Sequence, residues 1–254
     1  MATVATLSVI VPVYNEAAHL ESFLERLLAS PCPIEREFVF VDDGSRDASY
    51  SILEQLSKKF PMRLLRQTPN QGKGAAVRRG IQEASGDFIL IQDADFEYDP
   101  GEVPALLQPL LEGRADVVYG SRFQGKEPPA VRTSSYHANR LLTWLSNLFS
   151  GVPLTDMETC YKLFRADLLQ SMNLTSERFG IEIELTAYAG KTAARIRELP
   201  ISYQPRTHFE GKKINWKDGV AALYHLVHYN FFRSFRDSFS GLPEKYHPKS
   251  EPRQ

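Results

Sequence analysis

Cysteine is scarce in this 254-residue chain, which holds only Cys32 and Cys160. Two cysteines are too few for a disulfide framework and fit a reducing compartment. A charge excess is absent too, because 30 basic residues face 31 acidic ones. This balance argues against a dedicated nucleic-acid-binding protein. The hydrophobic share of 43% is typical of a globular protein and excludes wholesale disorder.

Long apolar runs are missing as well. Residues 220–232 form the most apolar late stretch, but His225, His228 and Asn230 interrupt it. A membrane-spanning helix needs about 20 mostly apolar residues. The N-terminus has no basic residue before its first apolar run, so it does not resemble a signal peptide. Neither a zinc-like Cys/His spacing nor a P-loop motif is present.

Short apolar runs alternate with amphipathic segments in the first half of the chain. Residues 7–13 are a β-branched run that ends at a turn, and residues 16–29 follow with apolar side chains at helical spacing. The same order predicts strands at 37–41, 62–66, 87–92 and 115–120, and helices at 47–60, 73–84 and from 102 onward. The alternation predicts an α/β fold: a mainly parallel sheet with helices on both faces.

The pattern changes after residue 121, where a polar segment with two prolines predicts a loop over residues 122–135. Beyond it we expect a helix at 136–149, a strand at 159–164, a helix at 182–191, a strand at 195–203, a polar loop at 204–215 and an aromatic-rich helix at 216–235. The sequence shows no internal repeat and no low-complexity linker. It therefore predicts a single domain over residues 1–240 and a disordered tail over residues 241–254.

Acidic residues follow three of the predicted strands. Glu16 comes after the first strand, Asp42 and Asp43 follow the second, and Asp93 and Asp95 follow the very apolar fourth strand at residues 87–92. Ligands of open parallel sheets bind beyond the carboxyl ends of the strands. We therefore expect these side chains around one cleft, where they suit a cation or a ribose.

The triplet Asp93-Ala94-Asp95 is the sharpest chemical signal. Two carboxylates one residue apart at the tip of a strand can hold a hard divalent cation that also binds phosphate oxygens, and Glu97 offers a third oxygen ligand. The alternative is an acidic turn that leads into the helix at Asp99. The other acids at strand ends favour the cation site.

Two further motifs allow more than one interpretation. Asp42 and Asp43 could cap the following helix, but Asp47 is better placed to do so, which leaves the pair to accept hydrogen bonds from a nucleobase or a ribose. The turn at residues 70–74 is rich in glycine. It lacks the last glycine of G-x-G-x-x-G and follows the third strand, which argues against a dinucleotide fold.

Taken together, the motifs resemble family 2 glycosyltransferases of the GT-A fold, a Rossmann-like architecture that binds nucleotide sugars. Within this family they resemble the dolichyl-phosphate mannose synthase and polyprenyl-phosphate glycosyltransferase branch. The resemblance covers about residues 6–230 and rests on residues 9–16, 41–47, 70–74, 93–95, 120–122, 156–162, 179–184 and 211–219. It is specific for the family and much less specific for the sugar.

The resemblance implies roles for residues at matching positions. The nucleotide-sugar-binding set would comprise Pro12, Tyr14, Glu16, Asp42, Asp43, Lys73, Asp93, Ala94 and Lys212. Mg²⁺ or Mn²⁺ would be bound by Asp93, Asp95 and Glu97, the last where mannose synthases often have glutamine. The catalytic set would comprise Asp95, Arg122, Asp156, Glu184 and Arg206, with both arginines meeting donor or acceptor phosphates.

The implied reaction is an inverting, metal-dependent transfer of a hexose from a nucleotide diphosphate sugar to a polyprenyl phosphate. Such a phosphate is already ionised near neutral pH and needs no strong base. A sugar hydroxyl would need one, and Asp156, Glu158, Glu182 and Glu184 remain unranked candidates, each of which could instead be a structural partner of a basic residue. The base and sugar of the donor are not determined by the sequence.

Three other functions stay open. A transferase with a soluble or polysaccharide acceptor would share every donor motif. A sugar nucleotidyltransferase would normally have a glycine-rich loop after the first strand, which is absent here. A non-catalytic nucleotide-sugar-binding protein would be expected to lose one of the acidic motifs, all of which are present.

Many relatives continue into transmembrane helices, whereas this chain resembles the peripheral members. Its aromatic helix at residues 216–235 could lie in a membrane interface next to a lipid acceptor, or its aromatic side chains could simply pack on the sheet. We expect a cytoplasmic protein, with possible contact to the cytoplasmic face of a membrane and no nucleic-acid partner.

Overall fold

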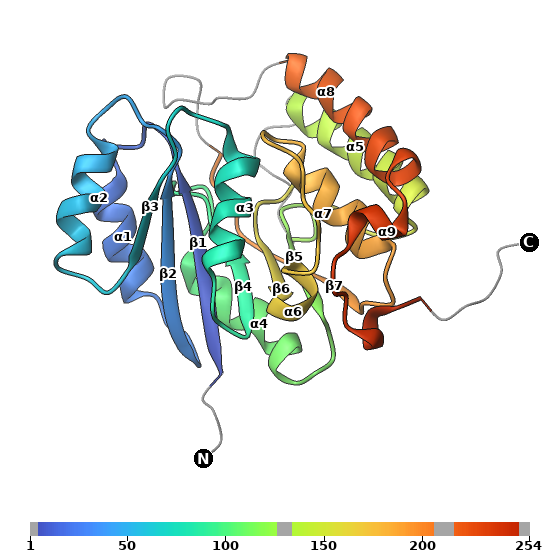
Figure 1. The fold of residues 1–254 in the computed structure, drawn as a ribbon, viewed down its shortest axis with the longest axis horizontal. Helices are drawn as coiled ribbons and strands as arrows, with labels where there is room; N and C mark the ends of the chain where they lie inside the picture. The colour runs from blue at the N-terminus through green and yellow to red at the C-terminus, as the bar shows by residue number, and fades with distance from the viewer. Residues whose placement is uncertain (1–4, 126–133, 206–215, 249–254) are drawn as a thin grey trace, which may run out of the picture.

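A seven-stranded sheet forms the centre of the computed structural model, which describes residues 5–125, 134–205 and 216–248 (Figure 1). Its strands lie in the order β3-β2-β1-β4-β6-β5-β7. Their bounds are β1 Thr6–Val13, β2 Glu35–Asp42, β3 Arg63–Arg66, β4 Phe88–Ile91, β5 Val117–Ser121, β6 Lys162–Arg165 and β7 Ile196–Pro200. The expected α/β fold with a mainly parallel sheet is confirmed.

The parallel half of the sheet brings three strand ends to one edge. β1 pairs in parallel with β2 and β4, so that Val13 lies beside Asp42 and Ile10 beside Ile91. β6 runs antiparallel between β4 and β5, while β5 and β7 are parallel. β1 is buried almost throughout, because both of its faces are covered, and this explains its continuous apolar run.

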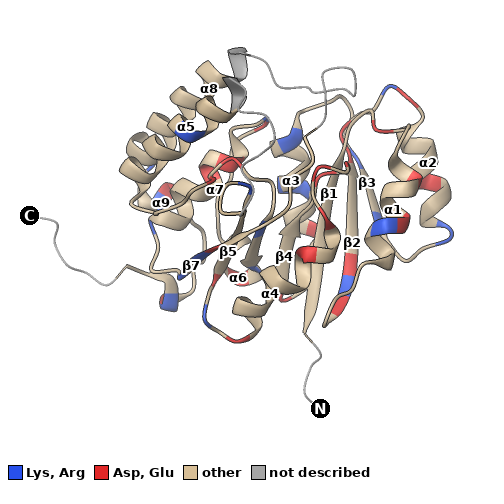
Figure 2. Cartoon of the chain, turned by 180° about the vertical axis from the view of Figure 1, so that it is seen from behind, with Lys and Arg blue, Asp and Glu red and all other residues tan. Residues whose placement is uncertain are grey.

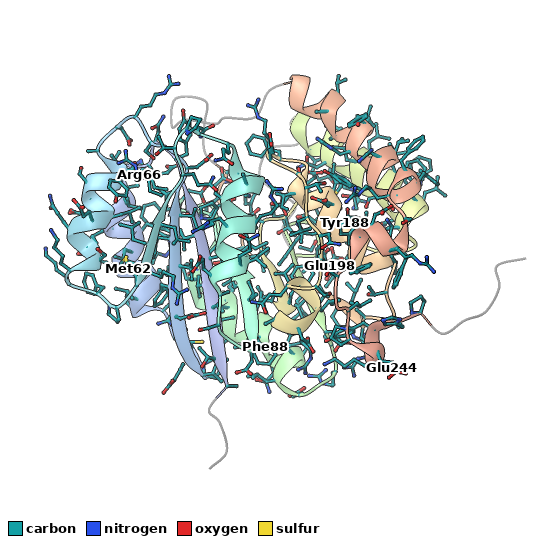
Figure 3. The ribbon with its side chains drawn as sticks, in the orientation of Figure 1. Met62, Arg66, Phe88, Tyr188, Glu198 and Glu244 are labelled. Carbon is teal, nitrogen blue, oxygen red and sulfur yellow. The ribbon has the colours of Figure 1, made fainter. Side chains whose placement is uncertain are left out.

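Helices cover both faces of the sheet. Their bounds are α1 Leu20–Ala29, α2 Ser49–Ser57, α3 Lys73–Glu83, η1 Pro100–Glu102, α4 Val103–Leu111, α5 Ser134–Ser150, α6 Ala166–Leu169, α7 Ile181–Gly190, α8 Trp216–Val227, η3 His228–Phe232, α9 Phe235–Ser238 and η4 Glu244–Tyr246. α3 packs on β1 and β2, and α4 packs against β5 and β6 on the opposite face (Figure 2). Side chains fill the space between the layers (Figure 3).

The C-terminal region differs from the sequence-based expectation in two ways. The helix expected at residues 216–235 ends at Phe232, where α8 has continued directly into the π-helix η3, and a capping box of Ser234 and Asp237 starts α9 as a separate helix. Residues 241–248 pack on the domain, which corrects the expected disordered tail. Tyr246 is buried there, and its hydroxyl donates a hydrogen bond to Asp167. Residues 249–254 lie outside the described residues.

The helices were also compared with what a membrane-spanning helix requires. Among residues 5–125, 134–205 and 216–248, none of the helices combines the length and the hydropathy that a membrane crossing requires.

Candidate active site

The turn after β1 is tied to the segment after β2. Three backbone N–H groups of this turn, those of Asn15, Glu16 and Ala17, donate to side chains of residues 45, 49 and 47 in that order. Asp47 also accepts from Ser49, although Ala48 occupies the N-cap position of α2, so Asp47 joins two segments rather than only capping a helix. Pro12, Tyr14 and Glu16, expected at the nucleotide pocket, are each partly buried at this edge.

Asp43 organises the loop that leads into α3. One of its carboxylate oxygens accepts from the Gly72 N–H at 2.7 Å and the Asn70 amide at 2.7 Å, and the other accepts from the Gln71 N–H at 2.8 Å and the Gln67 amide at 2.9 Å. Asp43 is nearly fully buried. Its carboxylate is thus committed to the protein, which makes it a support of the expected nucleotide pocket.

Asp42 is placed differently, at the last position of β2. Its side chain is fully buried, and its Oδ2 accepts from the Ser45 N–H at 3.3 Å and lies 3.6 Å from Arg66 Nε. Its Oδ1 is buried without a hydrogen-bond partner among the described residues. A buried carboxylate oxygen without a donor is costly, so Asp42 retains the acceptor capacity that Asp43 has used.

Lys73 carries a positive charge to the end of β4. Its Nζ lies 2.9 Å from Asp93 Oδ1, 3.0 Å from Asp93 Oδ2 and 3.1 Å from Glu182 Oε1. Burial alone lowers the pKa of Lys73, but Asp93 above all outweighs it and holds the pKa well above its ordinary value. Lys73 is therefore a fixed ammonium bound to the first carboxylate of the D-x-D triplet.

The Lys73 backbone is fixed as firmly as its charge. Gly72 precedes it with a φ of 98°, and a Cβ there would lie 2.3 Å from the carbonyl oxygen of Glu177. Glycine is thus required by both conformation and space.

A second lysine lies on the other side of Glu182. The Nζ atom of the fully buried Lys162 lies 2.5 Å from Glu182 Oε2. The contacts run from Asp93 to Lys73, then to Glu182 and on to Lys162, so each buried charge lies next to a charge of opposite sign.

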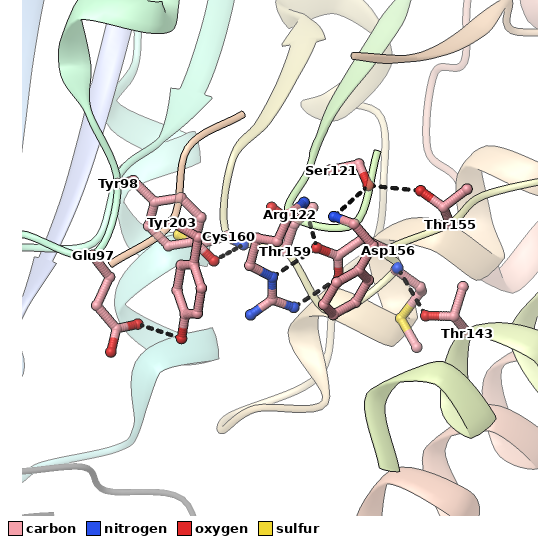
Figure 4. Close-up of polar contacts among 12 residues, drawn as sticks. Glu97, Tyr98, Ser121, Arg122, Thr143, Thr155, Asp156, Thr159, Cys160 and Tyr203 are labelled. Carbon is pink, nitrogen blue, oxygen red and sulfur yellow. Dashed lines mark hydrogen bonds and ion pairs between the residues drawn. The ribbon is translucent and has the colours of Figure 1, made fainter. Parts of the chain in front are cut away.

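Asp95 and Glu97 follow Asp93 around a tight turn. Asp95 is nearly buried, and its Oδ1 accepts from the Glu97 N–H at 3.1 Å. Glu97 Oε2 accepts from the Tyr203 hydroxyl at 3.2 Å, and the Glu97 carbonyl accepts from the Gln204 N–H (Figure 4). The segment after β7 thus joins the carboxylates after β4. The motifs did not indicate Tyr203, and its position at the end of the predicted strand at 195–203 was the available signal.

Arg122 is held rigidly beside these groups (Figure 4). Its Nε and one terminal nitrogen donate to Asp156 at 2.6 and 2.7 Å, and its guanidinium lies 5.1 Å from the Tyr203 ring centre. Asp156 is fully buried, and its backbone N–H donates to Glu198. Asp156 therefore fixes the orientation of the Arg122 guanidinium by a bidentate pair.

Glu158 is the unusual carboxyl group of the cluster. The residue is partly exposed, but its Oε1 is buried without a hydrogen-bond partner among the described residues. Burial, and then the charge of Glu182, raises its pKa to about 7. Glu158 therefore exchanges a proton near neutral pH.

We expect Glu158 to make the stability of this chain pH-dependent. The folded chain keeps a proton that the unfolded chain, with a pKa of 4.5, releases. Stability should therefore fall as the pH rises from about 4.5 to about 7, by up to about 3 kcal/mol, and remain reduced above that range. Urea unfolding of the parent and Glu158→Gln at about pH 5 and about pH 8 measures this. An equal pH dependence in both proteins would contradict it.

Glu184, expected in the catalytic set, contacts the loop at residues 175–176. Two residues along α7 place it about 200° around the helix from Glu182. It is fully buried, and its carboxylate accepts from the N–H groups of Thr175 and Ser176 and from the Thr175 hydroxyl. The structure gives Glu184 the task of holding this loop. Arg206 and Lys212 lie outside the described residues.

The donor set after β4 suits a hard cation. Carboxylate oxygens are the ligands that Mg²⁺ and Mn²⁺ prefer, and Asp93, Asp95 and Glu97 supply them within five residues. Within the ranges that the structure describes, no three His, Cys, Asp or Glu side chains are gathered closely enough to hold a metal. The residue types fit a hard cation, but in this structure Asp93 binds Lys73 and the three carboxylates do not converge on one point.

Known proteins share sequence features with this chain that identify its family. The family model described as "Glycosyl transferase family 2" matches residues 8–172, more than half of the chain. This chain belongs to glycosyl transferase family 2. The matched region includes Lys73, Arg122 and the acids after β2 and β4, whereas Glu182, Glu184 and Glu198 lie beyond it. The family recognised from the sequence motifs is confirmed.

Curated relatives of this family 2 chain carry related names. A dolichol-phosphate mannosyltransferase of Pyrococcus furiosus is 38% identical over 116 residues, 46% of this chain and 33% of the relative. An undecaprenyl-phosphate 4-deoxy-4-formamido-L-arabinose transferase of Edwardsiella ictaluri is 29% identical over 214 residues, 83% of this chain and 63% of the relative. The chain thus spans less than two thirds of the length of each.

Solved structures share the fold at low identity. Glucosyl-3-phosphoglycerate synthase of Mycobacterium tuberculosis, crystallised with Mn²⁺, UDP and phosphoglyceric acid, has a TM-score of 0.67 at 19% identity, covering 89% of this chain and 79% of that one. TarS of S. aureus, in complex with UDP-GlcNAc, has a TM-score of 0.58 at 21% identity, covering 87% and 65%. The GT-A architecture expected from the sequence is confirmed.

Proposed function

We propose that this chain transfers a hexose from a nucleotide diphosphate sugar to a polyprenyl phosphate of the dolichyl or undecaprenyl type. The observation that carries the proposal is the acidic turn after β4 in a family 2 fold, where Lys73 binds Asp93, Asp95 accepts from the Glu97 N–H, and Tyr203 lies between Glu97 and Arg122. The names of the curated relatives, which specify dolichol phosphate and undecaprenyl phosphate, support the acceptor.

The donor is assigned to the carboxyl ends of β1, β2 and β4. Tyr14 and Glu16, on the turn after β1, would line the nucleotide pocket with Pro12. Asp42 has the acceptor oxygen that a nucleobase or ribose donor needs, whereas Asp43 shapes the loop beneath it. This division of labour refines the expectation that Asp43 itself touches the nucleotide.

Asp93, Asp95 and Glu97 would hold Mg²⁺ or Mn²⁺ next to the donor diphosphate. The cation, when bound, would offset the negative charge that develops on the leaving nucleoside diphosphate. Lys73 would contribute a second positive charge. Because Lys73 contacts both Asp93 and Glu182, it would keep its ion pair with Glu182 when Asp93 binds the metal.

Lys73 and a divalent cation should compete for Asp93. We expect Lys73→Met to raise the affinity for Mn²⁺ without nucleotide by roughly tenfold, because a unit charge a few ångströms from the site is worth about 1–3 kcal/mol. Titration of free Mn²⁺ by electron paramagnetic resonance measures this without any turnover. Arg114→Met, which removes an exposed cation near the start of β5, is the control. Unchanged Mn²⁺ affinity in Lys73→Met would contradict the competition.

The acceptor would attack the anomeric carbon from the face opposite the leaving group, which inverts the configuration. A polyprenyl phosphate brings its own ionised oxygen, so the chain needs only to orient it, a task suited to the rigid Arg122 guanidinium. A hydroxyl acceptor is the second candidate, and Glu158 favours it, because a carboxyl with a pKa of about 7 can take up a proton at neutral pH.

A screen of donors and acceptors tests the proposal. Purified protein receives UDP- and GDP-sugars with Mg²⁺ or Mn²⁺, with and without a short polyprenyl phosphate. Release of nucleoside diphosphate that depends on the lipid phosphate would support it and identify the donor. Metal-dependent release without any effect of the lipid would move the acceptor to a hydroxyl compound and make Glu158 the next residue to test.

A further inference from the structure

The loop at residues 174–178 is held by an acid of α7. The fully buried Glu184 carboxylate accepts from the Thr175 N–H at 2.8 Å, from the Thr175 hydroxyl at 2.9 Å and from the Ser176 N–H at 2.8 Å. Hydrogen bonds to a carboxylate are stronger than those between neutral groups. Three of them on one buried side chain fix this end of the loop, which we name the 174–178 loop.

The other side of the 174–178 loop supports the first turn of α3. The Glu177 carbonyl accepts from the Ala75 N–H at 3.1 Å. The first N–H groups of an α-helix have no carbonyl partner inside the helix, so the loop supplies one. The two backbones also touch, because a Cβ on Gly74 would lie 2.5 Å from the Ser176 carbonyl oxygen. A movement of the loop would therefore move the start of α3.

Lys73 is the first residue of α3, and α7 acts on it at two points. Its Nζ lies 3.1 Å from Glu182 Oε1, and its backbone lies in the turn that the 174–178 loop supports. Glu182 and Glu184 both belong to the first turn of α7. A lysine side chain has many rotamers, so its ammonium is held at one point with a smaller loss of entropy when the backbone is fixed too.

We propose that Glu184 is a positioning residue for Lys73. By fixing the 174–178 loop, Glu184 holds the first turn of α3 where the Lys73 ammonium lies 2.9 Å from Asp93 Oδ1. The consequence for the donor rests on the proposed function, in which Lys73 lies next to the diphosphate, whereas the link from Glu184 to α3 does not. A purely local role would confine the effect of Glu184 to the loop itself.

Amide hydrogen exchange of the chain alone, without metal, donor or acceptor, tests the link to α3. Glu184→Gln replaces one acceptor oxygen with a donor amide, so one N–H of the loop loses its acceptor. We expect exchange in residues 73–76 to become at least roughly tenfold faster relative to β1, whose buried amides report unfolding of the whole domain. Faster exchange confined to the 174–178 loop would overturn the proposal.

Glu198→Gln is the matched control for this measurement. Glu198 also accepts from two backbone N–H groups of a loop, those of residues 155 and 156, but this loop is not the one that supports α3. Exchange in residues 73–76 should therefore stay at the parent rate relative to β1. An equal acceleration in both variants would show a general loss of stability and overturn the link.

Thr175→Val keeps the test available if Glu184→Gln loses its fold by circular dichroism. It removes one of the three donors to Glu184 and leaves the carboxylate and both N–H donors in place. We expect a smaller acceleration in residues 73–76, of roughly threefold. Parent-like exchange there, together with faster exchange in the 174–178 loop, would contradict the positioning role.

A double-variant comparison tests whether the effect reaches the Lys73 ammonium. Mn²⁺ is titrated by electron paramagnetic resonance into Glu184→Gln with Lys73 present and in the Lys73→Met background. The lost carboxylate charge acts in both backgrounds and cancels in the comparison. Relative to that background, Glu184→Gln should raise the Mn²⁺ affinity roughly threefold more with Lys73 present, because a less firmly held ammonium competes less well for Asp93.

The outcomes of this comparison separate the proposal from the proposed function. Equal shifts of Mn²⁺ affinity in both backgrounds would show that Glu184 does not act through Lys73 and would overturn its positioning role. A parent chain that binds no Mn²⁺ would contradict the metal site of the proposed function, and the exchange rates of residues 73–76 would then decide the role of Glu184.

Discussion

Replacing Asp95 by asparagine is expected to lower glycosyl transfer by roughly a thousandfold at saturating donor, because a ligand charge beside the developing diphosphate charge is lost. Asparagine keeps an oxygen for the Glu97 N–H, which Asp95 Oδ1 now accepts at 3.1 Å. The turn after β4 should therefore survive, and the melting temperature should change little. Steady-state rates with Mg²⁺ and with Mn²⁺ measure the effect.

Asp99 supplies the control for this change. It lies four residues on, pairs with Arg26 at the surface and accepts from the Gly101 N–H, a contact that asparagine can also make. Asp99→Asn should transfer sugar at nearly the parent rate. If Asp95→Asn kept its activity at saturating metal, the proposed metal site after β4 would be wrong.

Replacing Arg122 by glutamine is expected to lower the free energy of unfolding by about 3–5 kcal/mol, because it leaves the fully buried Asp156 without its bidentate partner. The double variant Arg122→Gln/Asp156→Asn replaces the stranded carboxylate with an amide. It should recover most of this loss, because the uncompensated charge is gone. Urea unfolding of the parent, the single variant and the double variant measures the stabilities.

The same double variant tests what Arg122 does for catalysis. Stability should return, but glycosyl transfer should stay low. Neither amide carries the positive charge and the two parallel N–H donors with which a guanidinium binds a phosphate. Recovery of transfer together with stability would show that Arg122 only supports the fold, and phosphate binding would have to be assigned to another group.

The sequence predicted the elements around the site well because local signals specify them. The apolar run of β4, followed after Gln92 by Asp93-Ala94-Asp95, located the acidic edge, and the parallel pairing of β1, β2 and β4 brings their ends together. The roles of the site residues stay a prediction, because side-chain partners that the sequence does not show bear on them. Asp43 was expected to contact the nucleotide, yet four protein donors surround its carboxylate.

Glu182 and Glu184 show why such partners were not predictable. Both are acids in the first turn of α7, and the sequence offered each as a candidate base. Helical geometry sends one toward Lys73 and Lys162 and the other toward the loop at 175–176. Only the contacts made across the fold separate a carboxylate that pairs with two lysines from one that holds a loop.

Local patterning by itself determined that this chain folds as an α/β domain with acids at the carboxyl edge of its sheet, and only the resemblance of its motifs indicated glycosyl transferase family 2. Such patterning follows from backbone periodicity and short-range chemistry, which neighbouring residues specify. The tertiary structure alone decided that Lys73 binds Asp93, that Asp156 fixes Arg122, and that α5 packs beside α8. These relations join residues far apart in the chain, and their energies depend on burial and distance that exist only after folding.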